Sequence, residues 1–254
     1  MDQEQSNQNL RKQFLEDGYV ALPGFLNPQE VGELRENVER FIVDVAPTMP
    51  SEEVFYEDKT TKTTLKQLQQ MFQYDDYFNN LMFGSKFEEL AAKLLGHEVH
   101  GVNMQYFNKP PQVGLPTPPH QDGYYFMLEP NEAVTMWLAL EDVDAENGCV
   151  RYVRHSHLQG LRPHGKTQTL GFSQGMTDFG TEEDIQNEIA FPAQPGDLLV
   201  HHALTVHRAD GNTSKDRTRK ALGFIYYSTA AQESEEKKLR HATLVEEMKS
   251  SGKV

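Results

Sequence analysis

Residues 97–127, HEVHGVNMQYFNKPPQVGLPTPPHQDGYYFM, mark the point at which the pattern of the chain changes. Before this stretch, apolar residues recur with helical spacing, whereas after it short strand-like runs alternate with breaks rich in Gly and Pro. The stretch itself predicts a strand over Glu98–Asn108, a Pro-rich loop over Lys109–Pro119 and a strand over His120–Met127. Further strands are predicted at Ala133–Leu140, Cys149–Val153, Asp197–Val206 and Lys220–Ser228.

The first third of the chain predicts mainly helices. Asn27-Pro28-Gln29-Glu30 has the form of a helix start, with a capping Asn, Pro at the first helical position and Glu three residues after the cap. Ser85 begins a second helix of this kind, which Gly96 is expected to end. Helices first and many short strands afterwards predict one domain, a β-sandwich or barrel with helices on its outside. Its expected parts are a helical region at about 1–96, a strand-rich core at about 97–230 and a charged tail at 231–254, of which Gln232–Lys249 is expected to form a solvated helix.

Composition sets limits on partners and location. Acidic residues number 38 and basic residues 24, so the net charge of −14 disfavours nucleic acid and anionic lipid as partners. No apolar run approaches the roughly 20 residues that span a bilayer, and the N-terminus has no apolar segment typical of a secretory signal. The one cysteine, Cys149, fits a reducing compartment. We expect a cytoplasmic protein that binds neither nucleic acid nor membrane, as a monomer or a small homo-oligomer.

Pro119-His120-Gln121-Asp122-Gly123 carries the first candidate metal ligands. Residues two apart in a strand point to the same face, so His120 and Asp122 can present a nitrogen and an oxygen to one point. Two histidines and one carboxylate are the ligand set of non-haem iron(II) oxygenases, which leaves positions open for a cosubstrate and oxygen. A single His-x-Asp triplet is equally consistent with surface or capping residues.

The third ligand has to come from a distant part of the chain. His201, His202 and His207 are the candidates, and His207 lies at the far end of the predicted strand Asp197–Val206. A hairpin would bring His207 close to Arg219. An arginine beside the metal would suit 2-oxoglutarate, since the far carboxylate of this dicarboxylate needs a planar bidentate partner. Taken singly, His207 fits a loop cap and Arg219 a surface ion pair at least as well.

In this order, the motifs resemble those of the phytanoyl-CoA dioxygenase family. The family's amino-terminal unit is similar to FLEDGYVALPGFLNPQEVGELRENVERF (14–41), and the segment before its metal motif is similar to FNKPP (107–111). Its first ligand motif closely resembles PHQDGYYF (119–126). Its second histidine ligand and its cosubstrate arginine correspond to GDLLVHHALTVHRADGN (196–212) and TRKALG (218–223).

The resemblance implies a double-stranded β-helix, which is a cupin-like jelly roll, with flanking α-helices. It also implies an iron(II)- and 2-oxoglutarate-dependent dioxygenase that uses O2 to hydroxylate an unactivated C–H bond of a small molecule, releasing succinate and CO2. By this resemblance the catalytic iron ligands are His120, Asp122 and His207, and the residues of the cosubstrate pocket are Arg219, Gln105 and Trp137. Because the loop after His207 is slightly long, Arg217 is an alternative to Arg219 as the residue that binds 2-oxoglutarate. We prefer Arg219, which adjoins the apolar run.

Three other functions stay open on the sequence: a zinc hydrolase with the same ligands, a cupin-like binding protein that has lost its chemistry, and a halogenase of the same fold. Core packing and strand pairing explain Trp137 and Gln105 nearly as well as a cosubstrate does.

A long polar segment, His155–Asn187, is a candidate lid. Arg154, Arg162 and Lys166 lie in or next to it, and on an acidic protein they indicate a substrate with an anionic group. A solvated loop face explains these basic residues at least as well.

Overall fold

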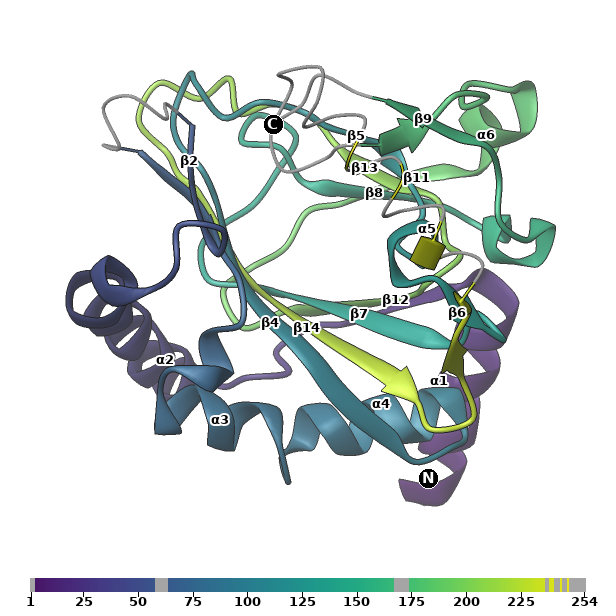
Figure 1. The fold of residues 1–254 in the computed structure, drawn as a ribbon, viewed down its shortest axis with the longest axis horizontal. Coiled ribbons are helices and arrows are strands. Elements are labelled where there is room, and N and C mark those ends of the chain that lie inside the picture. Colours follow the sequence, from purple (N-terminus) through teal and green to yellow (C-terminus); the bar gives the residue numbers. More distant parts are fainter. Residues whose placement is uncertain are drawn as a thin grey trace.

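The structure, a computed structural model, describes residues 3–57, 64–166 and 174–235, together with 238, 239, 243 and 246. Two antiparallel sheets face each other, and helices cover the outer face of the larger sheet (Figure 1). None of the helices in these ranges has the length and apolar character needed to cross a bilayer.

The larger sheet has seven strands in the order β1-β12-β7-β14-β4-β3-β2. Their bounds, in that order, are Tyr19–Leu22, Leu198–His202, Ala133–Ala139, Arg219–Ser228, Val99–Lys109, Leu65–Leu68 and Val54–Tyr56. The long pair β14–β4 forms its centre, with a register that runs from Arg219↔Lys109 to Ser228↔Val99.

The smaller sheet has four strands in the order β11-β8-β13-β5. Their bounds are Glu188–Phe191, Val150–Val153, His207–Ala209 and Thr117–His120. Two further strand pairs join β9 (His164–Lys166) to β10 (Gln174–Met176) and β6 (Leu128–Glu129) to β15 (Gln232–Glu233). The facing antiparallel sheets confirm the predicted jelly roll with flanking helices.

Two helices begin where the sequence predicts, and the second also ends there. Asn27 caps α2 (Pro28–Arg40) with a complete capping box, and Ser85 caps α4 (Lys86–Leu95), which ends at Gly96 with a φ of +78°. The other helices are α1 (Gln3–Asp17), α3 (Asp76–Met82), α5 (Gly123–Phe126) and α6 (Glu182–Asn187), with short 3-10 or π turns at Phe41–Val45, Ala46–Thr48, Met71–Gln73 and Ser156–Gln159.

Alternation along the strands of the larger sheet divides its side chains between two faces. Leu138, Val200 and Leu222 pack with helices α2 and α4 in the larger core. Trp137 and Leu199, one position away, pack instead with residues of the smaller sheet. The second set faces the space between the sheets, and that space holds the candidate site.

The predicted strand His120–Met127 is wrong. β5 ends at His120, and the chain turns at Asp122 (φ −58°, ψ −33°) into the short helix α5. Gly123 permits this turn, since a Cβ there would lie 2.5 Å from Asn131 Oδ1. His120 and Asp122 therefore do not meet by strand alternation.

The predicted hairpin between His207 and Arg219 is also wrong. β12 ends at His202, and His207 begins β13 in the smaller sheet, whereas Arg219 begins β14 in the larger one. Two distant segments fix the turn between β12 and β13, because Val206 N–H donates to Ser156 Oγ and Thr205 Oγ1 donates to Gly18 O. His207 and Arg219 line one cavity because the two sheets face each other.

Two further predictions can be followed only in part. The tail begins with strand β15, and its described residues at 235, 238, 239, 243 and 246 are helical, as predicted, while the rest of the tail after 235 lies outside the described residues. The segment 155–187 contains β9, β10 and α6, while 167–173 lie outside the described residues, so a lid there stays a prediction.

Candidate metal and cosubstrate site

Three predicted ligands converge on one point between the sheets. His120 Nε2 lies 3.4 Å from Asp122 Oδ1, and His207 Nε2 lies 3.7 Å from the same oxygen. The cross-strand pair His207↔His120 of β13 and β5 sets the two rings with centroids 4.0 Å apart. One donor atom from each residue lies within 4.8 Å of the others, and within the described ranges no other His, Cys, Asp and Glu side chains form such a group.

Backbone carbonyls hold the second nitrogen of both histidines. His120 Nδ1 lies 2.8 Å from Pro118 O, and His207 Nδ1 lies 3.0 Å from Thr205 O. A carbonyl only accepts, so the proton of each neutral ring is on Nδ1, and each Nε2 presents its lone pair. Metal-binding histidines are oriented in this way. The donor set therefore fits a divalent ion that takes nitrogen and oxygen ligands, such as iron(II) or zinc.

The protonation states also suit a cation. Burial, together with the nearby rings of His120 and His201, lowers the pKa of His207 well below its ordinary value. Burial alone would raise the pKa of Asp122, but the surrounding imidazoles more than offset this and hold it well below its usual range. At neutral pH the site presents a carboxylate beside a neutral His207 ring.

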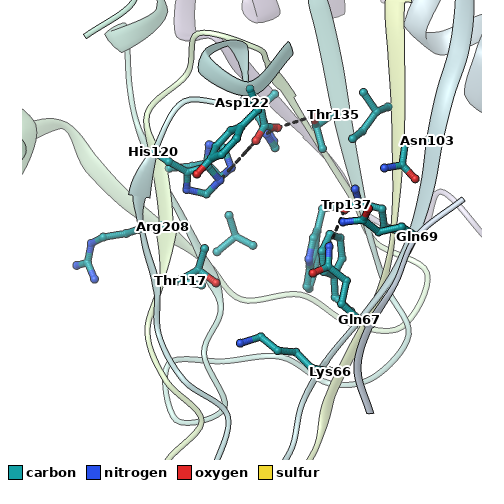
Figure 2. A pocket seen from close by; sticks show the side chains of 18 of the residues that line it. Lys66, Gln67, Gln69, Asn103, Thr117, His120, Asp122, Thr135, Trp137 and Arg208 are labelled. Atoms are coloured by element: carbon teal, nitrogen blue, oxygen red, sulfur yellow. Dashed lines mark hydrogen bonds and ion pairs between the residues drawn. The ribbon is translucent and has the colours of Figure 1, made fainter. Parts of the chain in front are cut away.

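A cavity of about 390 Å³ lies between the sheets and contains all six predicted site residues in its wall. Figure 2 shows His120 and Asp122 on one side of it, with Trp137 and Gln67 on the other. Gln105 also lines the cavity, and its Oε1 accepts a hydrogen bond of 3.3 Å from Gln67 Nε2. The volume is of the size that holds a small molecule.

Arg219 is a buried cation in this wall. It is 4% exposed, and its guanidinium carbon lies 5.4 Å from the Trp137 ring. Burial lowers its pKa to about 10, so it keeps its charge at neutral pH. Its Nε has no hydrogen-bond partner, and none of the described carboxylates forms an ion pair with it. Since buried charges are normally paired, this side chain is suited to an anionic ligand.

Arg217, the competing arginine, lies elsewhere. Its guanidinium is 2.9 Å from Asp144 and 2.6 Å from Glu146, and it is absent from the cavity wall. The geometry supports the preference for Arg219.

The other two candidate histidines lie on opposite faces of β12. His202 faces α1, with its ring 6.0 Å from that of Phe14. His201 faces the cavity and contacts Asp122. Sequence reasoning did not single out Tyr152 or Thr135, which belong to the same cluster. β12 is apolar on both faces before His201, so its alternation did not indicate which histidine faces the site.

Two of the three basic residues expected to bind an anionic substrate, Arg154 and Arg162, form ion pairs within the protein. Arg154 lies 2.9 Å from Asp17, and Arg162 lies 2.6 Å from Asp184 and 3.2 Å from Asp178. Neither arginine lines the cavity. Structural ion pairs therefore explain these two arginines better than an anion-binding site does.

Comparison with known proteins gives a consistent family assignment. The family model described as phytanoyl-CoA dioxygenase (PhyH) matches residues 14–221. "Phytanoyl-CoA dioxygenase domain-containing protein 1" of Danio rerio is 26% identical, with 86% of this chain and 89% of that protein covered. A "probable alpha-ketoglutarate-dependent hypophosphite dioxygenase" of Stutzerimonas stutzeri is 24% identical, with 87% and 78% covered.

Solved structures of similar fold carry the same kind of chemistry. The epimerase SnoN in complex with Fe3+, alpha ketoglutarate and nogalamycin RO matches with a TM-score of 0.73 and 25% identity, over 90% of this chain and 86% of that chain. The non-haem alpha ketoglutarate-dependent carbocyclase SnoK matches with a TM-score of 0.72 and 26% identity, over 92% and 86%.

Proposed function

The chain belongs to the phytanoyl-CoA dioxygenase family, and we propose that His120, Asp122 and His207 hold the iron(II) with which it carries out 2-oxoglutarate-dependent dioxygenation. One observation carries this assignment. Two imidazole nitrogens and one carboxylate oxygen converge within 4.8 Å, while backbone carbonyls hold the opposite nitrogen of both rings.

Arg219 is the proposed partner of the far carboxylate of 2-oxoglutarate. It is a buried cation without an anion, in the wall of the same cavity as the three ligands. Its guanidinium can form the planar bidentate pair that a carboxylate prefers. Trp137 contacts its face, and Gln105 supplies an amide to the same wall. A zinc hydrolase would not need this arginine.

The chain's own residues bind, orient and exclude water. Iron(II), when bound, supplies the activation of O2 that is coupled to the conversion of 2-oxoglutarate to succinate and CO2. The facing sheets bury His120 and His207 and so limit solvent access to the ligands. Asp122 retains the carboxylate that halogenases of this fold replace by a small residue. We therefore propose hydroxylation of a C–H bond as the outcome.

The substrate we propose is small and polar. Lining residues on β3 and β4 and in the turn after β3 include many carboxamides, namely Gln67, Gln69, Gln70, Asn103, Gln105 and Asn108. The charged lining residues Lys66 and Arg208 pair with Glu57 at 3.4 Å and with Glu188 at 2.6 Å. Lys109 also lines the wall, but burial lowers its pKa to about 6, and its Nζ donates to the backbone carbonyls of Leu115 at 2.6 Å and Asp210 at 3.0 Å. Apart from Arg219, the described wall therefore favours an uncharged polar substrate over the anionic one that the sequence indicated.

We also propose a cytoplasmic location. Cys149 is buried in the core between the sheets with a free thiol, which fits the reducing cytoplasm. The monomer or small homo-oligomer expected from the sequence stays a prediction.

Metal removal tests the proposed function. The assay follows uncoupled turnover, in which 2-oxoglutarate is converted to succinate without any added substrate. The protein treated with a chelator should form no succinate, and added iron(II) should restore its formation. Zinc(II) at the same concentration is the matched control and should restore nothing, since it has no redox chemistry. Succinate measured by mass spectrometry provides the readout. Restoration by zinc, or no dependence on metal, would contradict the proposal.

A further inference from the structure

The Asp122 carboxylate uses its two oxygens differently. Oδ1 faces His120 and His207. Oδ2 accepts two hydrogen bonds from the protein, one from Thr135 Oγ1 at 2.5 Å and one from His201 Nε2 at 3.0 Å. Because Thr135 is on β7 and His201 on β12, the larger sheet holds the oxygen that points away from the two histidines.

Asp122 needs this support more than the histidines do. His120 and His207 are paired across the ladder of β5 and β13, so neighbouring strands fix their backbone. Asp122 lies after the end of β5, in the turn that begins α5. Its backbone has no strand partner, and its side chain contacts decide where the carboxylate points.

Asp122 determines which nitrogen of His201 donates, and Tyr152 contacts the other nitrogen. A carboxylate only accepts, so the bond to Asp122 Oδ2 requires a proton on His201 Nε2. Nδ1 then accepts, and the Tyr152 hydroxyl, 3.0 Å away on β8, donates to it. Tyr152 is 0% exposed and His201 is 3% exposed, so water does not compete for these bonds. The chain of contacts joins both sheets at Asp122.

We propose that His201, oriented by Tyr152 and acting with Thr135, is a positioning residue that restricts Asp122 to coordination of the metal through one oxygen. The inference rests on the metal site proposed above. A carboxylate can bind a metal through one oxygen or both, and two strong donors on Oδ2 leave only Oδ1 for the ion. One coordination position that a second oxygen would take then stays open. His201 itself is not a ligand, since its Nε2 proton is committed to Asp122.

The test compares Mn(II) binding among variants under anaerobic conditions, with the free ion measured by electron paramagnetic resonance. His201→Phe keeps a ring but removes the donor, and we expect its Mn(II) dissociation constant to rise roughly 10- to 100-fold, as for other partners that orient a ligand. His201→Gln can still donate and should recover part of the affinity. Tyr152→Phe leaves Nδ1 without its donor and should weaken binding by a smaller factor. His202→Phe, on the opposite face of β12, is the matched control and should bind as the unmodified protein does.

A second readout separates positioning from general damage. With iron(II) saturating, His201→Phe should reduce uncoupled succinate formation at saturating 2-oxoglutarate more than it raises the KM for 2-oxoglutarate. Wild-type Mn(II) affinity in His201→Phe, with affinity lost in Asp122→Ala, would overturn the positioning role and leave the metal site standing. Wild-type affinity in Asp122→Ala as well would refute the metal site itself. If His201→Phe does not fold, Tyr152→Phe decides, and unchanged Mn(II) affinity there overturns the proposal.

Discussion

His207→Ala is expected to abolish iron-dependent turnover. The substitution removes one of three ligand atoms that converge within 4.8 Å, and neither histidine of β12 is placed to replace it. His201 donates to Asp122 and His202 faces α1. Partners that only orient a metal ligand are worth about 10- to 100-fold in affinity or activity, so loss of the ligand itself should exceed roughly 100-fold. Succinate formation and Mn(II) binding measure the effect.

His202→Ala is the matched control for this variant. Its ring lies on the far face of β12 beside Phe14, so the change should lower stability and leave metal binding intact. Thermal unfolding of both variants without metal identifies any that fail to fold. Full activity in His207→Ala together with lost activity in His202→Ala would show that the ligand assignment is wrong.

Arg219→Ala is expected to raise the KM for 2-oxoglutarate strongly. The variant leaves a carboxylate of the bound cosubstrate without its partner in a buried site, and such losses cost about 2–5 kcal/mol. This corresponds to roughly 30-fold up to several thousand-fold in affinity. Uncoupled succinate formation against 2-oxoglutarate concentration gives the KM. Arg219→Lys should recover only part of the loss, because an ammonium group cannot pair in a bidentate way.

Arg217→Ala is the control for the proposed role of Arg219 in binding 2-oxoglutarate. Arg217 is an arginine two residues earlier, but its guanidinium pairs with Asp144 and Glu146 outside the cavity wall. Its removal should change the KM for 2-oxoglutarate little. Equal and small effects at the two positions would remove the basis for assigning Arg219.

Local chemistry made two of the helices, α2 and α4, predictable from the sequence. Asn27 and Glu30 form a capping box, and Gly96 takes the left-handed conformation that ends α4, because these features depend on residues a few positions apart. The family motifs likewise identified residues that the structure brings to one cavity. His120 and Arg219 lie on different sheets there, and spacing alone could not have placed them together.

Tertiary contacts explain where the sequence reasoning failed. Period-two alternation predicted that His120 and Asp122 share a strand face, but the turn at Asp122 depends on the close contact of Gly123 with Asn131. The predicted hairpin between His207 and Arg219 is wrong because hydrogen bonds to Ser156 and Gly18 fix the turn between β12 and β13. These partners come from elsewhere in the chain, so a local pattern carries no information about them.

The hydrogen bonds that join Asp122, His201 and Tyr152 could not be predicted from the sequence for a related reason. β12 is buried on both faces, so the hydrophobic pattern before His201 and His202 does not distinguish the cavity side from the helix side. Tyr152 is on a strand of the other sheet and meets His201 only when the sheets face each other.

Anaerobic titration of the iron(II)-loaded protein with 2-oxoglutarate tests the central claim most directly. If His120, Asp122 and His207 hold the iron and Arg219 holds the cosubstrate, a visible charge-transfer band should appear and saturate as 2-oxoglutarate is added. His207→Ala should show no such band, and Arg219→Ala should show it only at much higher 2-oxoglutarate concentration. An iron-loaded, folded protein that develops no band at any 2-oxoglutarate concentration would contradict the account.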